Sequence, residues 1–338
     1  MNTVLLDGFD ISSDGVSRAA HMLSRGAVVA IPTETVYGLA ANAFDADAVR
    51  RIFAAKGRPQ DNPLIVHISS IDELYPLVTE VPETAKKLAD AFWPGPLTMV
   101  LGKSDLLPDE ISAGLDTVAI RMPSHPVARE IIRLSGCPLA APSANISGRP
   151  SPTTAEHVVN DMMGKIDGIV MSDNSSVGVE STVILLADGQ KRLLRPGGIT
   201  LEMLESVIGE VDVDRAVLSS EVTEKVSSPG MKYKHYSPST NIVLINADSD
   251  RYCKFIADKV DCAAICFAED AAMLSCPKIV YGTSADQYTL AHGIFDALRR
   301  VDTLGVSCGY VHAPDRSGVG LAVYNRLLRA AGFEVIDL

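Results

Sequence analysis

The sequence predicts an α/β protein of two domains, built on a mixed or largely parallel sheet with helical layers. Apolar runs of strand length alternate with amphipathic helical patterns through residues 1–208, which is typical of strands connected by helices. A smaller set of alternating patterns follows at residues 241–338. A chain of 338 residues is also too long for one ordinary domain. We therefore expect two domains, joined by a linker at residues 209–240.

The first domain begins with a helical pattern at residues 14–26 and a buried strand at residues 27–31, which Pro32 ends. Thr33 and Thr35 follow and place hydroxyl groups at the C-terminal end of that strand. Ligands of α/β proteins bind at this edge of the sheet. An ordinary threonine-rich turn is the alternative interpretation.

A basic turn follows the next helical pattern, which ends at Lys56. Gly57 suits the left-handed conformation that terminates helices, so Lys56 and Arg58 lie on a turn, where both side chains can converge on one anion. The strand predicted at residues 64–68 carries His67. A basic loop without a ligand is the alternative, but similar polar groups follow other strands and favour an anion site.

Strands and helices continue to alternate up to residue 208. Strands are predicted at 97–101, 118–123 and 138–141, at 168–171, in a segment that begins near Ser181, and in one that ends at Arg195. Helices are predicted at 71–78, 82–92, 126–134, 155–163 and 200–208.

Polar side chains recur at the ends of these strands. Arg121 lies in an apolar strand, so it is either a salt-bridged structural residue or an anchor for a carboxylate or phosphate. Six such groups on one region of a sheet describe a ligand site, with cations for phosphate and hydroxyls for orientation. The groups are Thr33 with Thr35, Lys56 with Arg58, Arg121, Ser143 with Asn145, Ser181, and Arg195.

The linker is charged and rich in Ser and Pro, but residues 228–238 also hold Tyr, His and Lys side chains between prolines. We expect residues 232–238 to fold over the mouth of the site, with Tyr236 touching the nucleotide or phosphate; a passive tether is the alternative. Gly318 and Gly320 open the last predicted helix, at 317–331, where close backbone packing is favoured over phosphate binding. Strands of the second domain are predicted at 242–245, 262–267, 278–281 and 306–311.

Composition argues against a broad nucleic-acid surface, because the net charge is −12 and only 5% of the residues are aromatic. A small anion in a local cationic pocket remains compatible with this balance. The six cysteines form no C-x-x-C pair, so reduced thiols are expected rather than a zinc site. The N-terminus lacks a basic signal region and no apolar run reaches membrane length, so we expect a cytoplasmic protein.

Several motifs resemble those of YrdC-like domains, and in combination the chain resembles the longer, two-domain form of the threonylcarbamoyl-AMP synthases. The first-domain motifs are PTETVYGL at 32–39, KGRP at 56–59, NPL at 62–64, SAN at 143–145, SG at 147–148, ESTV at 180–183 and LRPG at 194–197. The others are SPG at 228–230, HYSP at 235–238, GVGLA at 318–322 and NRL at 325–327. Departures from the family's motifs are minor: Ala40 stands where a second Gly is common, and Val319 stands where Leu is usual.

The resemblance implies that L-threonine, bicarbonate and ATP condense to threonylcarbamoyl-AMP and pyrophosphate. Partner proteins would then transfer the threonylcarbamoyl group to the tRNA adenosine next to the anticodon, and we expect no stable nucleic-acid binding by this chain itself. The implied fold is a twisted mixed sheet with a cationic cavity, a linker, and a Rossmann-like domain.

We predict site residues from this resemblance and the polar groups together. The predicted ATP ligands are Lys56 and Arg58, which are also the predicted catalytic residues, with Asn62, Thr117, Ser143, Asn145, Ser151, Arg195 and Tyr236. The predicted threonine ligands are Thr35, His67, Arg121, Ala141 and Ser181. No metal ligand is predicted from the protein, and Mg²⁺ is expected on the triphosphate through phosphate oxygens and water.

Two other functions are alternatives to synthesis of the adenylate. One is an RNA-binding or ribosome-maturation protein without catalysis, which the net charge disfavours. The other is a carbamoyl transferase that uses carbamoyl phosphate, which the absence of Cys-rich acylphosphatase-like or zinc-finger segments disfavours.

Overall fold

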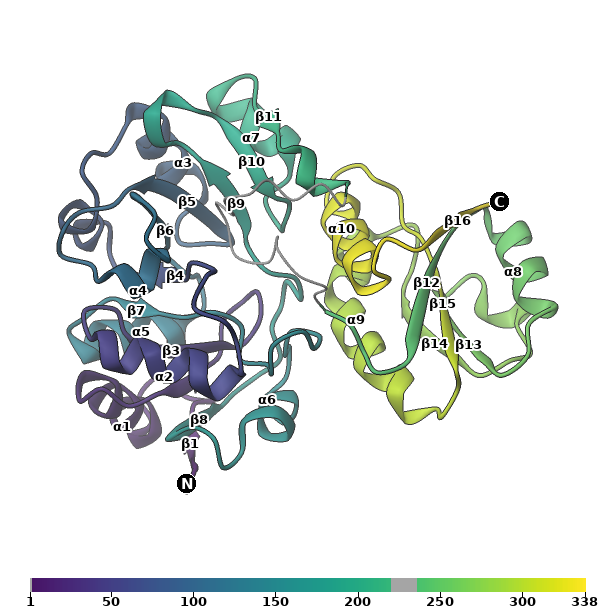
Figure 1. Cartoon of the computed structure of the whole chain (residues 1–338), viewed down its shortest axis with the longest axis horizontal. Helices are drawn as coiled ribbons and strands as arrows, with labels where there is room; N and C mark the ends of the chain where they lie inside the picture. Colours follow the sequence, from purple (N-terminus) through teal and green to yellow (C-terminus); the bar gives the residue numbers. More distant parts are fainter. Residues whose placement is uncertain (1, 220–235) are drawn as a thin grey trace.

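Two separate sheets organise the chain in the computed structural model (Figure 1). The structure describes residues 2–219 and 236–338. The first sheet has 11 strands and the second has five. The strand β11 (Asp212–Val213) and the 3₁₀ turn η4 (Arg215–Val217) continue the first part of the chain beyond residue 208, where we expected the linker to begin. The linker residues 220–235 lie outside the described part.

The first sheet is mixed, within the prediction of a mixed or largely parallel sheet, because it contains both parallel and antiparallel pairs. Its strands, in spatial order, are β1 (Val4–Asp7), β8 (Gly168–Met171), β2 (Val29–Ile31), β3 (Gly38–Asn42), β7 (Leu139–Ala140), β4 (Ile65–His67), β6 (Thr117–Arg121), β5 (Leu97–Gly102), β9 (Thr182–Leu185), β10 (Arg192–Arg195) and β11. Successive residues of a strand point to opposite faces. Val29 and Ile31 of β2 therefore join one hydrophobic core, while Ala30 and the preceding Val28 join another.

Capping residues decide where the helices of the first domain begin and end. The Asp45 carboxylate accepts hydrogen bonds from the first turn of α2, and Gly57 ends that helix with φ of 61°. The helix predicted at 71–78 is wrong: two 3₁₀ turns, η1 (Ile71–Glu73) and η2 (Tyr75–Leu77), occupy it, because Pro76 lacks the N–H that an α-helix requires. The helices are α1 (Asp14–Ser24), α2 (Ala46–Lys56), α3 (Glu83–Phe92), α4 (Asp109–Ser112), α5 (Pro126–Ser135), α6 (Ala155–Met162) and α7 (Leu201–Ile208).

The second sheet is entirely parallel. Its strands, in spatial order, are β14 (Lys278–Gly282), β13 (Cys262–Phe267), β15 (Cys308–His312), β12 (Asn241–Asn246) and β16 (Val335–Asp337), the last of which was not predicted. The helices are α8 (Ser249–Ala257), α9 (Gln287–Arg300) and α10 (Gly320–Ala330). A Cβ on Gly320 would collide with the Asp315 carbonyl, and the Gly320 N–H donates to Gln287 Oε1 (2.9 Å), so close backbone packing is confirmed there.

The helices α9 and α10 cover the face of the second sheet that is turned toward the first domain, while α8 lies on the far side (Figure 1). Val36 and Val179 of the first domain are part of the hydrophobic core of the second. Gly178 (φ +83°) packs so closely on α9 that a Cβ there would collide with the backbone of His292. The two domains therefore share a packed interface rather than a simple tether.

Candidate functional site

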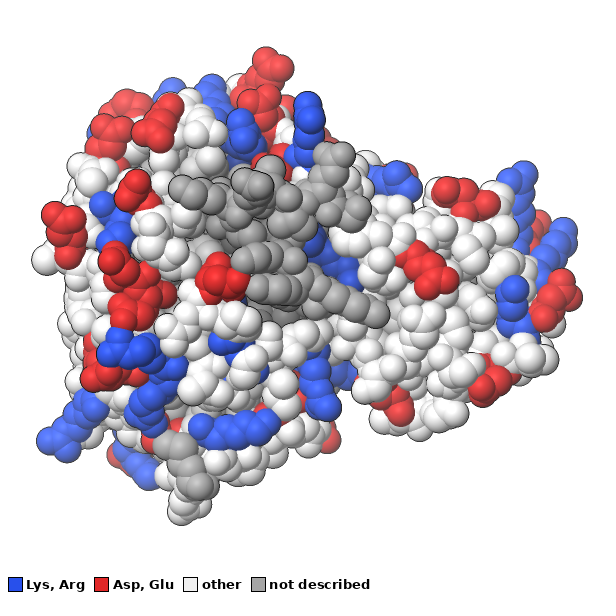
Figure 2. All heavy atoms as spheres, viewed as in Figure 1, with Lys and Arg blue, Asp and Glu red and all other residues white. Residues whose placement is uncertain are grey.

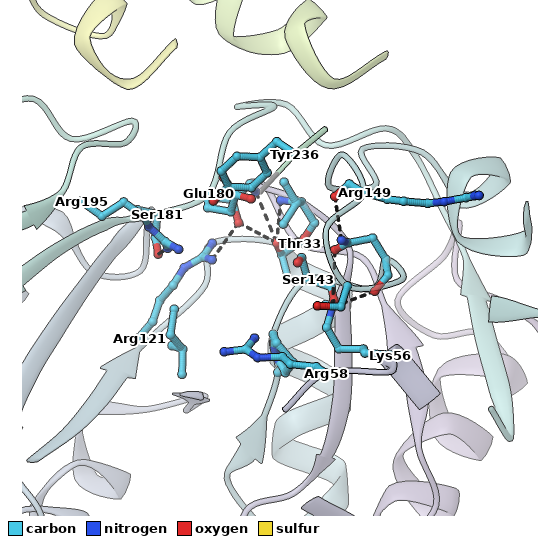
Figure 3. Close-up of a pocket in the computed structure, with 18 of the residues that line it drawn as sticks. Thr33, Lys56, Arg58, Arg121, Ser143, Arg149, Glu180, Ser181, Arg195 and Tyr236 are labelled. Carbon is cyan, nitrogen blue, oxygen red and sulfur yellow. Dashed lines mark hydrogen bonds between the residues drawn. The ribbon is translucent and has the colours of Figure 1, made fainter. Parts of the chain in front are cut away.

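A pocket lies in the first domain where the predicted polar groups meet (Figure 3). The space in and at the mouth of it that no protein atom occupies is about 760 Å³, open solvent included. All but three of the predicted site residues line it. The lining includes Thr33, Thr35, Lys56, Arg58, His67, Arg121, Ala141, Ser143, Asn145, Arg149, Glu180, Ser181, Arg195 and Tyr236.

Lys56 is buried at the end of α2, and its ammonium group is directed at protein oxygens. It donates to the backbone carbonyls of Ser143 and Asn145 (2.8 Å for Asn145) and to the Asn145 Oδ1 (3.4 Å). Burial, reinforced by the charge of Arg58, lowers the Lys56 pKa well below its usual value. The predicted phosphate ligand therefore supports the segment at 143–145 in this structure.

Arg58 is half-buried and supports the turn that carries it. Its guanidinium donates to the carbonyls of Asn62 (3.1 Å) and Pro63 (3.3 Å). Its Nε atom is buried and has no hydrogen-bond partner among the described residues. Burial lowers the Arg58 pKa to about 10, which leaves the group charged at neutral pH. Arg58 thus offers the pocket a cation with an unused donor.

Arg121, at the end of β6, has the salt bridge that the structural interpretation expects, and its role as an anchor for a carboxylate or phosphate stays a prediction. Its guanidinium lies 2.7 Å from Glu34 Oε1, and it donates to Thr35 Oγ1 (2.7 Å) and to the Gly95 carbonyl (3.2 Å). Burial alone would raise the Glu34 pKa, but Arg121 and the Ser124 N–H outweigh it and hold that pKa below its usual value. Arg121 is therefore ion-paired and also lines the pocket.

His67 enters the same wall from β4 as a neutral side chain. Burial, followed by the charge of Arg121, lowers the His67 pKa to about 3. Its Nδ1 lies 3.3 Å from the Ile65 carbonyl. A neutral imidazole can exchange hydrogen bonds with a substrate but adds no positive charge.

Ser181, directly before β9, and Arg195, at the end of β10, line the pocket on the same side as Arg121 (Figure 3). The Ser181 hydroxyl is 2.7 Å from Thr98 Oγ1, and Arg195 donates to the Ser181 hydroxyl (3.2 Å) and to its carbonyl (3.1 Å). The pairing of β9 with β10 shifts register between Leu193 and Arg195, and such irregularities redirect a side chain. Burial lowers the Arg195 pKa to about 10.

Tyr236 closes the lining from the part of the linker that is described. Its ring centroid lies 5.3 Å from that of Phe295 on α9, so the second domain supports it. Tyr236 adopts φ of 63°, an uncommon conformation for a non-glycine residue. Residues 232–235 of the segment predicted to fold over the site lie outside the described part.

Three predicted ATP ligands do not line the pocket, and their role stays a prediction. Asn62 is buried, and its carbonyl accepts from Arg58. The Ser151 hydroxyl donates to Glu180 Oε1. Thr117 begins β6, four residues from Arg121, which corresponds to roughly 13 Å along a strand.

Thr33, which the sequence placed among the polar groups of the site, lines the pocket, whereas sequence reasoning missed Arg149 and the two buried acids, Glu34 and Glu180. Both acids lie directly beside predicted site residues within quoted motifs, which was the available signal. Their partners could not be found in the same way, since Glu180 pairs with Arg326, 146 residues away in the second domain. The guanidinium of Arg149 points away from the other labelled side chains (Figure 3) and lies 3.5 Å from Asp161.

The lining carries both signs of charge. The basic residues include Lys56, Arg58, Arg121 and Arg195, but Glu34 and Glu180 offset part of that charge from within or beside the wall. A net cationic cavity therefore stays a prediction. Within residues 2–219 and 236–338, no group of three or more His, Cys, Asp or Glu side chains is arranged to hold a metal ion. No helix among the described residues is long and apolar enough to span a membrane.

Comparison with known proteins identifies the family. A model described as telomere recombination, covering Sua5, YciO and YrdC, matches residues 21–197, and the threonylcarbamoyl-AMP synthase C-terminal domain matches residues 199–332. A threonylcarbamoyl-AMP synthase of Pyrococcus abyssi is 46% identical over 95% of both chains. One of Bacillus subtilis is 47% identical over 98% of this chain and 96% of the relative.

A solved structure agrees with these matches. The crystal structure of P. abyssi Sua5 complexed with L-threonine has a TM-score of 0.93 and 43% identity, and covers 99% of this chain and 100% of that chain. These matches confirm the resemblance seen in the motifs and the predicted fold class. The chain therefore belongs to the threonylcarbamoyl-AMP synthase family.

Proposed function

We propose that the pocket condenses L-threonine, bicarbonate and ATP into threonylcarbamoyl-AMP and pyrophosphate. The observation that carries this proposal is the convergence of Arg58, Arg195 and Arg121 with hydroxyl groups and a neutral His67 on one pocket. Transfer of a nucleotidyl group needs positioned reactants and charge stabilisation more than covalent help from the protein. The P. abyssi relative, which was solved with L-threonine, supports the same substrate here.

The reaction proceeds in two steps. The amine of threonine reacts with bicarbonate to give a carbamate and water. A carbamate oxygen then forms a bond to the α-phosphorus of ATP, while the bond from that phosphorus to the bridging oxygen breaks and pyrophosphate leaves. Because the attacking oxygen exists only after the carbamate forms, pyrophosphate release requires all three substrates.

The ATP side of the pocket is assigned to Arg58, Arg195, Ser143, Asn145 and Tyr236. The unused Nε donor of Arg58 suits a phosphate oxygen. Lys56 supports this side indirectly, by holding the carbonyls of the 143–145 segment, and contacts a phosphate itself only if it gives up one of those bonds. The predicted ligands Asn62, Thr117 and Ser151 belong to the same proposal.

The threonine side is assigned to Thr35, His67, Arg121, Ala141 and Ser181. Arg121 would bind the substrate carboxylate while it keeps its contact with Glu34. The hydroxyls of Thr35 and Ser181 and the neutral imidazole would orient the amine and the hydroxyl of threonine.

The side chains that line the pocket fit Mg²⁺ only as an ion that the substrate phosphates bind. Glu180 lines the pocket but is engaged by Arg326 and Ser151, so the described lining supplies no carboxylate set for the ion. We propose that Mg²⁺ is bound by triphosphate oxygens and water, where it neutralises phosphate charge. We further propose that the reaction takes place in the cytoplasm and that separate transfer proteins use the adenylate to modify tRNA.

One assay tests this proposal. The pure protein is incubated with ATP, L-threonine and bicarbonate, pyrophosphate is quantified and the product is weighed by mass spectrometry. We expect threonylcarbamoyl-AMP, with pyrophosphate release that requires both threonine and bicarbonate. Brisk release with ATP alone would contradict the proposal. Lys and Arg are interspersed with Asp and Glu on the face shown in Figure 2, so filter binding of tRNA at moderate salt should be weak.

A further inference from the structure

Glu180 is a buried acid at the wall of the pocket, directly before Ser181. One of its carboxylate oxygens accepts from the Ser151 hydroxyl. The other accepts from Arg326 Nε at 2.9 Å. Arg326 belongs to α10 of the second domain and is completely buried. An acid of the pocket wall in the first domain is thus ion-paired with a cation of the second.

Arg326 also holds a second segment of the same wall. It donates to the Pro196 carbonyl (2.8 Å) and lies within 3.4 Å of the Glu180 carbonyl. Pro196 follows Arg195, and Glu180 precedes Ser181. One guanidinium therefore spans the two segments that carry Arg195 and Ser181, and those two side chains are hydrogen-bonded to each other.

The packing around this guanidinium limits how the wall can move. Gly178 is pressed against α9, and Val179 is buried in the core of the second domain. The Arg326 guanidinium carbon lies 5.9 Å from the centroid of the Tyr236 ring, another lining group. The segment at 178–181 is thus held by α9 at one end and by α10 at the other.

We propose that Arg326 is a positioning residue for the reaction, through which the second domain fixes Ser181 and Arg195 in place. This inference rests on the proposed assignment of those two residues to the substrates. The Asn325 amide donates to the Val217 carbonyl (2.6 Å), which adds a further hydrogen bond between α10 and the first domain. Docking of the second domain is in this way a condition for a complete substrate site.

The protonation of Glu180 supplies a signature of this role. Burial alone would raise the Glu180 pKa, but the charges of Arg326 and Arg195 and the Ser151 hydroxyl hold it below its usual value. The other groups whose charge acts across this site are Lys56 and the Tyr236 phenol. Without Arg326 the Glu180 pKa rises, so the carboxylate takes up a proton at a higher pH. The acidic limb of the pH–activity profile, where activity falls with decreasing pH, should therefore shift to higher pH.

The test compares Arg326→Met with wild type in two readouts: the kinetics of pyrophosphate release, and L-threonine affinity by calorimetry, both from pH 5 to 9. We expect kcat/KM to fall at least about tenfold, threonine affinity to weaken, and the acidic limb to shift upward. The double variant Glu180→Gln with Arg326→Met has no carboxylate at position 180. The shift of the acidic limb should therefore disappear, and part of the threonine affinity should return. Arg326→Lys keeps the positive charge but loses the planar guanidinium. Its kcat/KM and threonine affinity should therefore lie between those of wild type and those of Arg326→Met.

Leu298→Ala is the matched control, because Leu298 is buried in the second domain core and does not line the pocket. It should lower the melting temperature without moving the pH profile. The inference is overturned if folded Arg326→Met keeps the wild-type affinity and pH profile, or if its losses match those of Leu298→Ala. If Arg326→Met does not fold, the double variant decides: an unshifted acidic limb with threonine affinity still below wild type supports the inference, and wild-type affinity in the absence of Arg326 overturns it. A wild-type protein that binds threonine but forms no adenylate would contradict the proposed function, while the affinity data would still decide the inference.

Discussion

The two walls of the pocket are supported in different ways. On one wall, Lys56 holds the backbone of Ser143 and Asn145, and all three residues belong to the first domain. On the other wall, Glu180 and the Pro196 carbonyl are held by Arg326, which belongs to the second domain. Both supports use a buried cation on backbone carbonyls. The difference is that the first wall is complete within its own domain, whereas the second requires two domains to dock.

This comparison suggests a division of labour between cations that face the substrate and cations that face the protein. Arg58 keeps a buried donor without a partner among the described residues. Lys56 and Arg326 direct theirs to protein oxygens. Removing a cation of the first kind should affect mainly the reaction, because Arg58 supports only its own turn. Removing one of the second kind should affect both stability and the reaction.

The largest effect on rate is expected from Arg58→Ala. Loss of a cation that stabilises the phosphates in the transition state should lower kcat by roughly 10²-fold or more. Arg58→Lys should recover part of the rate, since it keeps the charge without the planar fork. Steady-state kinetics and a urea unfolding curve check this, and an unchanged rate in Arg58→Ala would remove Arg58 from the site.

Lys56→Met should reduce both rate and stability. The methionine keeps the length of the apolar stem but leaves the carbonyls of Ser143 and Asn145 without their donor. Unsatisfied buried groups cost about 1–3 kcal/mol each, so the free energy of unfolding should fall more than in Arg58→Ala, with a rate loss of roughly tenfold. Equal stability of the two variants would show that Lys56 is not a structural support.

Tyr236→Ala should lower activity by roughly tenfold, because it removes a lining ring that packs on Phe295. Tyr236→Phe keeps the ring and loses only the hydroxyl. If the phenylalanine variant is as impaired as the alanine variant, the hydroxyl and not the ring serves the site. Comparison of kcat and KM for ATP in the two variants separates these roles.

A smaller effect on activity is expected where an interdomain contact lies away from the pocket wall. Arg299 on α9 donates to Asp161 (2.8 Å) and to the Pro150 carbonyl (2.6 Å). Arg299→Met should lower the free energy of unfolding by about 1–3 kcal/mol while kcat/KM stays within roughly threefold of wild type. A kinetic loss as large as that of Arg326→Met would mean that any weakening of the interface impairs the site.

The smallest effect concerns pH. With a pKa of about 3, His67 should remain neutral from pH 5 to 8, and its ring signals in an NMR titration should not move in that range. The folded pKa lies below the unfolded value of about 6.5, so the unfolded state binds more protons below pH 6.5. Stability should therefore decline as pH falls from 6.5 toward 3, and His67→Gln should make that decline shallower. A His67 ring that titrates near pH 6.5 would contradict the assigned environment.

Much of the fold follows from local features of the sequence. Apolar runs mark β2, β5 and β13, and Asp45 and Gly57 bound α2 because capping depends on residues within one turn. The helix predicted at 71–78 was wrong because its apolar residues have helical spacing, while Pro76 breaks the helix. The short strand β16 was missed because its three residues carry too little periodicity.

The sequence alone identified the family through its motifs and most of the residues that line the pocket, because hydroxyl and basic residues at strand ends are visible without a structure. Tertiary structure decided where those side chains point. The strand order places β4 beside β6 and β7, which brings His67 to Arg121, and docking of α10 brings Arg326 to Glu180. Partners separated by 87 or 146 residues leave no local pattern. Buried charges must find partners wherever packing places them, so the direction of Lys56 and the cation for Glu180 emerge only when the chain is folded.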